Sequence, residues 1–118
     1  MSFPHLPSVA LPTVATAVLL LCLAPVLEEI VFRRGLQETL LQLVAPRDAI
    51  GLPVINLVTA LTFAGAHLWV QPGALAALTA VPALLIGFVY QRQRRLGPCI
   101  ALHCLFNAAW IAWASLPS

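Results

Sequence analysis

The charged residues of this chain are confined to two short stretches, and this distribution constrains the fold more than any other feature. Residues 28–48 hold seven of the ten charges and residues 92–95 hold the other three, so residues 1–27, 49–91 and 96–118 contain no Asp, Glu, Lys or Arg. About 20 apolar residues are needed to cross the core of a bilayer. The run 49–91 is therefore long enough for two crossings, and each of the other runs for one.

The composition supports the same interpretation. Hydrophobic residues make up 61% of the chain and charged residues only 8%, whereas soluble domains carry roughly 25% charged residues. We therefore expect an all-α polytopic membrane bundle of about four transmembrane helices, formed by residues 1–118 as a single unit. The composition excludes a soluble enzyme, a secreted disulfide scaffold and a nucleic-acid-binding protein. The expected spans are 9–27, 54–70, 74–90 and 96–116.

Breaks between the spans are marked by loop-forming residues. Prolines, a glycine and two charges make residues 45–53 the clearest loop, and Gln-Pro-Gly at 71–73 predicts a tight turn. The first helix is expected to continue beyond its apolar part through Glu28 to Val44, because that segment contains good helix formers. Pro82 predicts a bend in the third span.

The arginines predict the orientation of the chain in the membrane. With four crossings, the loop that holds Arg47 and the loop that holds Arg92, Arg94 and Arg95 share one face. The positive-inside rule places both loops in the cytoplasm and both termini outside. We expect a multi-pass protein of a bacterial inner membrane, with the lipid bilayer as its immediate partner.

Ionisable residues in apolar helices are costly and therefore point to function. Glu29 and Arg33 are four residues apart, so they share a helix face and are expected to pair. Glu28 is rotated about 100° away and has no such cation, which leaves it available as a base. Arg34 and Glu38 repeat the spacing and are expected to form a second pair. A solvated face at the membrane surface would give the same pattern.

Two further helices carry an imidazole each. Phe63 and His67 share one face, as do His103 and Asn107. Each histidine alone is typical of a helix–helix hydrogen bond, but together with the glutamates they suggest hydrolysis in a water-poor site. Glu28, His67 and His103 could hold a zinc ion whose water attacks a carbonyl. Alternatively, Glu and His activate water directly while His and Asn stabilise an oxyanion, and no cofactor is needed.

The three motifs together resemble the CPBP family of membrane proteases, the CAAX-protease and bacteriocin-processing group also called Abi or Rce1-like. Its pattern is Glu-Glu-x-x-x-Arg, then Phe-x-x-x-His, then His-x-x-x-Asn, and the chain matches all three in order. The resemblance implies a glutamic intramembrane endopeptidase in which Glu28 and His67 activate water. It further implies that His103 and Asn107 form the oxyanion site and that Arg33 holds Glu29. We expect no metal ion, with zinc as the alternative.

The expected substrate is a membrane-associated protein or peptide, cleaved in a C-terminal sorting or processing step, and an oligomer or a partner protein could complete the substrate channel. Two rival functions remain. Four spans and a membrane-embedded glutamate also suit a small proton-coupled exporter, although an exporter has no need of Arg33 or of His103 with Asn107. A noncatalytic immunity or scaffold protein could keep the same fold.

Overall fold

A computed structural model describes residues 13–44 and 50–117, and within these residues every regular element is a helix. The first helical rod comprises α1 (Val14–Val18), α2 (Ala24–Glu29) and α3 (Glu38–Val44). Two segments of wider, π-type turns join these pieces without a break, Leu19–Leu23 and Ile30–Gln37. The predicted continuation of this helix to residue 44 is confirmed.

The described chain continues through α4 (Gly51–His67), α5 (Gly73–Leu78), α6 (Ala80–Gln93) and α7 (Leu96–Ala114). Helix α4 starts and ends three residues earlier than the expected span 54–70. Pro53 lies in its first turn, where backbone N–H groups have no partner in the helix, so a proline is tolerated there instead of in the loop.

The bend that was expected at Pro82 is an interruption at Thr79, between α5 and α6. A regular helix would bring the N–H of residue 82 to the carbonyl of Leu78, but proline has no N–H and its ring clashes with that carbonyl. The N–H and the hydroxyl of Thr79 both donate to Ala76 O, at 3.1 and 2.6 Å, which closes the last turn of α5. The proline therefore acts one turn upstream of its own position.

Three helical stretches of the described chain are long and apolar enough to cross a membrane: Val14–Leu43, Gly73–Gln93 and Leu96–Ala114. Helix α4 is apolar but has 17 residues, about 25 Å at 1.5 Å per residue, slightly less than the bilayer core. The chain is thus an all-α membrane bundle. Many large apolar side chains point outward, including Val14, Trp69 and Leu105, as expected of surfaces that face lipid.

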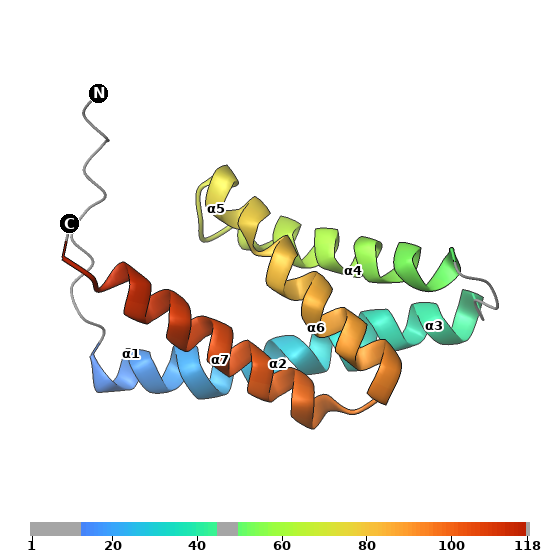
Figure 1. The fold of residues 1–118 in the computed structure, drawn as a ribbon, viewed down its shortest axis with the longest axis horizontal. Coiled ribbons are helices and arrows are strands. Elements are labelled where there is room, and N and C mark those ends of the chain that lie inside the picture. The colour runs from blue at the N-terminus through green and yellow to red at the C-terminus, as the bar shows by residue number, and fades with distance from the viewer. Residues whose placement is uncertain (1–12, 45–49, 118) are drawn as a thin grey trace.

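The helices pack around α6, which contacts both α4 and α7, while α7 packs against α2 and the π-type segment Leu19–Leu23 (Figure 1). Ala60 of α4 and Ala83 of α6 are buried in one core cluster with Phe63. Small residues at a crossing let two helices approach closely, and this contact brings α4 and α6 together beside the first helical rod.

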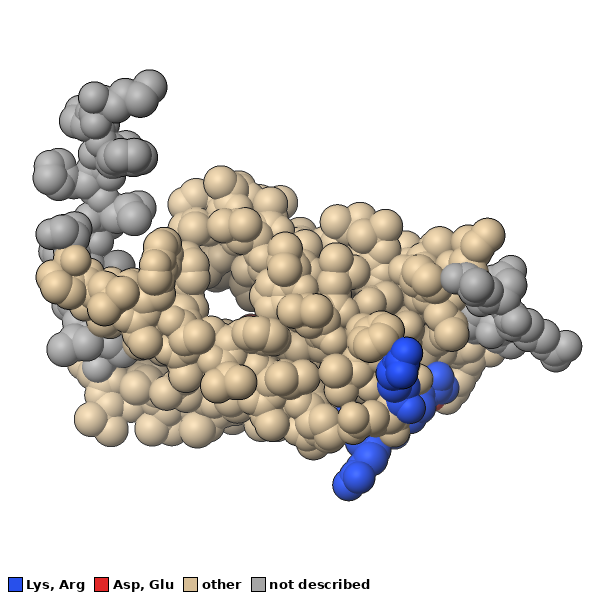
Figure 2. Space-filling model, in the orientation of Figure 1, with Lys and Arg blue, Asp and Glu red and all other residues tan. Residues whose placement is uncertain are grey.

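The arginines of the 92–95 segment lie on the lower edge of the molecule, at the turn between α6 and α7 (Figure 2). Arg94 ends α6 in the left-handed conformation and its Nη2 donates to Glu38 Oε1 at 2.8 Å, which holds the α6–α7 turn against α3. Tyr90 also donates to Glu38, at 2.5 Å. The predicted pair of Arg34 with Glu38 is wrong, because partners from another helix reach Glu38 instead. Arg47, the other loop arginine of the topology prediction, lies outside the described residues.

Candidate active site

One face of the first helical rod is buried at every fourth residue: Pro25, Glu29, Arg33, Gln37 and Leu41. A regular α-helix would rotate such a series by about 40° at each step. The second π-type segment holds more residues per turn and removes most of this drift. The polar members of the series therefore stay in line, on the face that meets α6 and α7.

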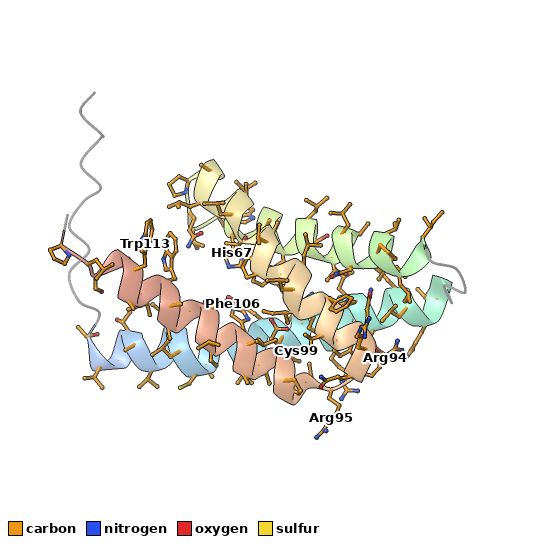
Figure 3. All side chains as sticks on the ribbon, in the orientation of Figure 1. His67, Arg94, Arg95, Cys99, Phe106 and Trp113 are labelled. Atoms are coloured by element: carbon orange, nitrogen blue, oxygen red, sulfur yellow. The ribbon has the colours of Figure 1, made fainter. Side chains whose placement is uncertain are left out.

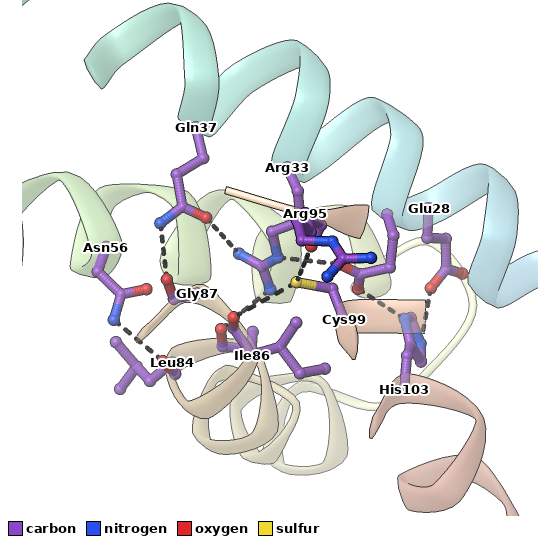
Figure 4. A network of polar contacts seen from close by, with 12 residues as sticks. Glu28, Arg33, Gln37, Asn56, Leu84, Ile86, Gly87, Arg95, Cys99 and His103 are labelled. Carbon is purple, nitrogen blue, oxygen red and sulfur yellow. Dashed lines mark hydrogen bonds and ion pairs between the residues drawn. The ribbon is translucent and has the colours of Figure 1, made fainter. Parts of the chain in front are cut away.

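Arg33 is the centre of a buried polar network (Figure 4). Its Nε donates to Glu29 Oε2 at 3.0 Å, which confirms the predicted pair. Its Nη1 donates to Gln37 Oε1 at 3.1 Å, and its Nη2 donates to Ala83 O at 2.9 Å. Gln37 Nε2 donates in turn to Gly87 O at 3.1 Å. The charge of a fully buried guanidinium is thereby compensated, and the first rod is fastened to the backbone of α6.

Gly87 allows this close contact because it has no side chain. A Cβ at this position would lie 1.9 Å from Asn56 Oδ1 and 3.2 Å from Arg33 Nη1. Asn56 is itself buried, and its Nδ2 donates to Leu84 O at 3.0 Å. Its Oδ1 is the one buried side-chain polar atom of the described chain that lacks a hydrogen-bond partner. The backbone of α6 at Gly87 therefore lies close to the side chains of Asn56 and Arg33.

His103 of α7 lies between the two glutamates. Its Nδ1 is 2.8 Å from Glu29 Oε1 and its Nε2 is 3.2 Å from Glu28 Oε2. Carboxylate oxygens only accept hydrogen bonds, so either both ring nitrogens carry hydrogen or one carboxyl group is protonated. One proton is thus shared among three side chains from two helices. The sequence motifs grouped His103 with Asn107 and gave no sign of these contacts.

The two glutamates differ as predicted, with Glu29 held by Arg33 and Glu28 left outside that pair. The Glu29 side chain is fully buried, whereas that of Glu28 is 32% exposed. Glu28 Oε2 is bound to His103, and the contacts of the described residues give its Oε1 no partner. In this arrangement Glu28 meets His103 and not His67.

His67 is the last residue of α4 and its ring packs on Phe63, with centroids 4.4 Å apart. Its Nδ1 is 2.8 Å from Phe63 O. A carbonyl only accepts, so Nδ1 carries the hydrogen and Nε2 of the neutral ring keeps a lone pair. Phe63 also contacts the His103 ring edge to face at 5.8 Å. One phenyl ring therefore holds both histidines at the same site.

Asn107 binds the first helical rod at the backbone carbonyl of Leu20, which is left without a donor inside that rod. The N–H of Ala24 is bonded to Leu19 O, five residues back, and Pro25 has no N–H, so Leu20 O finds no donor within the rod. Asn107 Nδ2 donates to it at 2.7 Å. One hydrogen of the amide is thus used structurally, and the second remains for another acceptor.

A cleft of about 320 Å³ lies beside these groups, and Arg33, Phe63, His67, His103 and Asn107 form part of its wall. Figure 2 shows an opening at this place, and Figure 3 shows His67 and Phe106 on opposite sides of it. Most of the remaining wall is apolar and comes from α5, α6 and α7: Leu75, Leu78, Val81, Pro82, Leu85, Ile86, Phe106 and Trp110. Glu28 is not part of the wall and is connected to it through His103.

Of the three residues expected as alternative zinc ligands, Glu28 contacts His103 directly and His67 bonds to the carbonyl of Phe63. In the described part of the chain, no group of three or more His, Cys, Asp or Glu side chains is placed to hold a metal ion.

Two residues of the network were missed by sequence reasoning. Gln37 lies four residues after Arg33, so the spacing that predicted the Glu29–Arg33 pair could have been extended by one step. Asn56 could have been found only as an amide in an otherwise apolar segment of α4. Neither belongs to the three motifs on which the sequence analysis relied.

The fold and the site together define a polytopic membrane protein with a buried Glu–Arg–His network beside an apolar cleft. The sequence model of the type II CAAX prenyl endopeptidase Rce1-like family matches residues 10–109, and the chain belongs to this family. This membership supports peptidase activity within a membrane. No curated protein and no solved structure is significantly similar to the chain.

Proposed function

We propose that this protein is a glutamate-dependent intramembrane endopeptidase that hydrolyses a peptide bond of a membrane-associated protein. The observation that carries the proposal is that His103 and His67, from two helices, line one mostly apolar cleft, while Glu28, from a third helix, is connected to the cleft through its contact with His103. Such a cleft suits a hydrophobic peptide segment. The polar groups at its side supply acid–base chemistry at one point along that segment.

In the proposed reaction, Glu28 takes a proton from water through its free Oε1 while the water oxygen attacks the scissile carbonyl carbon. His67 Nε2 accepts a hydrogen bond from the other hydrogen of the water, which orients the lone pair of the attacking oxygen. The carbon–nitrogen bond then breaks, and the proton held by Glu28 passes to the leaving amine. His103, bound to both glutamates, holds the Glu28 carboxylate in place.

The contacts favour a different division of roles at the oxyanion from the one that the family resemblance implied. Both nitrogens of His103 are engaged with carboxylates, which supports a positioning role for this residue. Asn107 keeps one amide hydrogen after its bond to Leu20 O, so this N–H is the donor that we assign to the developing oxyanion.

The finer assignments belong to the same proposal. We place the 92–95 segment on the cytoplasmic side of a bacterial inner membrane, because its arginines follow the positive-inside rule. The cleft borders α5–α6 and α7, helices with exposed apolar surfaces, which suits a substrate that arrives within the bilayer. A processing step near the C-terminus of a membrane-anchored protein is the role that we assign.

The test is cleavage by purified protein in liposomes, with fragments identified by mass spectrometry. One set of peptides carries an apolar anchor that inserts into the membrane, and a matched set of the same sequences lacks it. We expect cleavage within or beside the anchor of the first set only, and none by His67→Phe, which keeps the packing on Phe63. Cleavage of the unanchored set alone, or equal cleavage by the variant, would contradict the proposal.

A further inference from the structure

We infer that Gln37 is a positioning residue of the site: by fixing the Arg33 guanidinium, it keeps one oxygen of Glu29 available to His103. The catalytic meaning of this role rests on the proposed function, whereas the positioning itself does not. Gln37 is fully buried and is absent from the wall of the cleft. It can therefore affect the reaction only through other residues.

Arg33 binds Glu29 through one carboxylate oxygen. Arginine–carboxylate pairs are frequently bidentate, with both carboxylate oxygens on one guanidinium. Here Nη1 donates to Gln37 Oε1 and Nη2 donates to Ala83 O, which fixes the guanidinium in a position where Glu29 receives a bond from Nε alone, through Oε2. Glu29 Oε1 stays free to bind His103 at 2.8 Å.

Glutamine suits this position because its amide both accepts and donates a hydrogen bond. The amide accepts from Arg33 at 3.1 Å and donates to Gly87 O at 3.1 Å, so both of its ends are held. An apolar side chain would release Nη1 and allow the guanidinium to turn onto both oxygens of Glu29. A carboxylate would still accept from Arg33, but it would compete with Glu29 for the positive charge. A neutral group with one acceptor and one donor meets both requirements.

A continuous series of polar contacts connects Gln37 to Glu28. Hydrogen bonds link Gln37 to Arg33, Arg33 to Glu29 and Glu29 to His103, and an ion pair links His103 to Glu28 (Figure 4). All members except Glu28 are buried, so water cannot easily replace a lost partner. A change at Gln37 should therefore reach the His103 ring without any contact with substrate.

The experiment that tests this inference observes His103 directly. Protein with ¹⁵N-labelled histidine rings is studied by NMR in detergent micelles without substrate, as wild type, Gln37→Met and Gln37→Glu. The sequence has only three histidines, so assignment by substitution is straightforward. We expect both variants to shift the His103 ring nitrogens and to leave those of His67 in place. Gln42→Met, an exposed position bound only to Glu38, is the matched control and should shift neither.

The Gln37 variants should change kcat but not KM. In the liposome assay, kcat of both Gln37 variants should fall roughly 10- to 100-fold, with KM unchanged because Gln37 does not line the cleft. His103 signals that superimpose on those of the wild type in both variants would overturn the inference, even if the variants unfold more easily. If the wild type cleaves no peptide, the proposed function fails, but the NMR comparison still decides whether Gln37 positions His103.

Discussion

Replacing Glu29 by Gln should destabilise the folded protein much more than the same replacement at Glu28. Glu29 is fully buried against Arg33, and removing one partner of a buried ion pair costs about 3–5 kcal/mol. Glu28 is one-third exposed and makes a single contact, with His103 at 3.2 Å, so its loss should cost about 1 kcal/mol. We therefore expect the two variants to differ by roughly 2–4 kcal/mol in their free energies of unfolding.

The assay is reversible unfolding of purified protein in mixed micelles by increasing SDS, followed through fluorescence of the three tryptophans. The double variant Glu29→Gln/Arg33→Met provides the internal check. The double variant removes the charge of Arg33 as well as that of Glu29. Its loss of unfolding free energy should therefore be smaller than the sum of the losses of the two single variants. Equal losses at Glu28 and Glu29, or strictly additive losses in the double variant, would refute the reasoning that a compensated charge holds the first helical rod to α6.

Three further outcomes follow from the structure. Gly87→Ala should cost about 1–3 kcal/mol in the same unfolding assay, because a Cβ there meets a buried side chain at 1.9 Å, whereas Gly65→Ala, with nothing within 4 Å, should be neutral or slightly stabilising. Reporter fusions should be cytoplasmic after Arg95 and external after Gly73; the reverse result would invert the proposed orientation. Peptide cleavage should survive treatment with a strong chelator and dialysis, because in the proposed reaction Glu28 and His67 act directly on water, and recovery only on adding zinc would contradict this.

The sequence predicted those parts of the fold and site that depend on local spacing. Charge-free runs predicted a membrane bundle, and the i, i+4 relation predicted the pair of Glu29 with Arg33. It could not predict that His103 binds Glu29, because these residues are 74 positions apart and meet only through the packing of α7 on the first rod. The bonds of Tyr90 and Arg94 to Glu38 could not be predicted either, because these residues lie on α6 and at its C-terminal end, far from Glu38 in the sequence.

Local backbone geometry accounts for the other features that the sequence did not predict. Burial of Gln37 depends on a four-residue period, which the π-type turns create and which a search for 3.6-residue periodicity does not favour. The bond from Asn107 to Leu20 O likewise depends on a carbonyl that Pro25 leaves without a donor. In both cases the residue was visible in the sequence, but its partner followed from a departure from regular helix geometry.

The most direct test of the account is the cleavage rate of Glu28→Gln, measured in liposomes with equal amounts of folded enzyme. Glu38→Gln is the control, since it makes the same chemical change on the same helical rod, away from the cleft. The account predicts that Glu28→Gln lowers kcat by roughly 10²–10⁴-fold, the usual contribution of a general base, while the protein still folds and Glu38→Gln keeps most of its activity. A Glu28→Gln enzyme that turns over within about threefold of the wild type would contradict the assignment of Glu28 as the base.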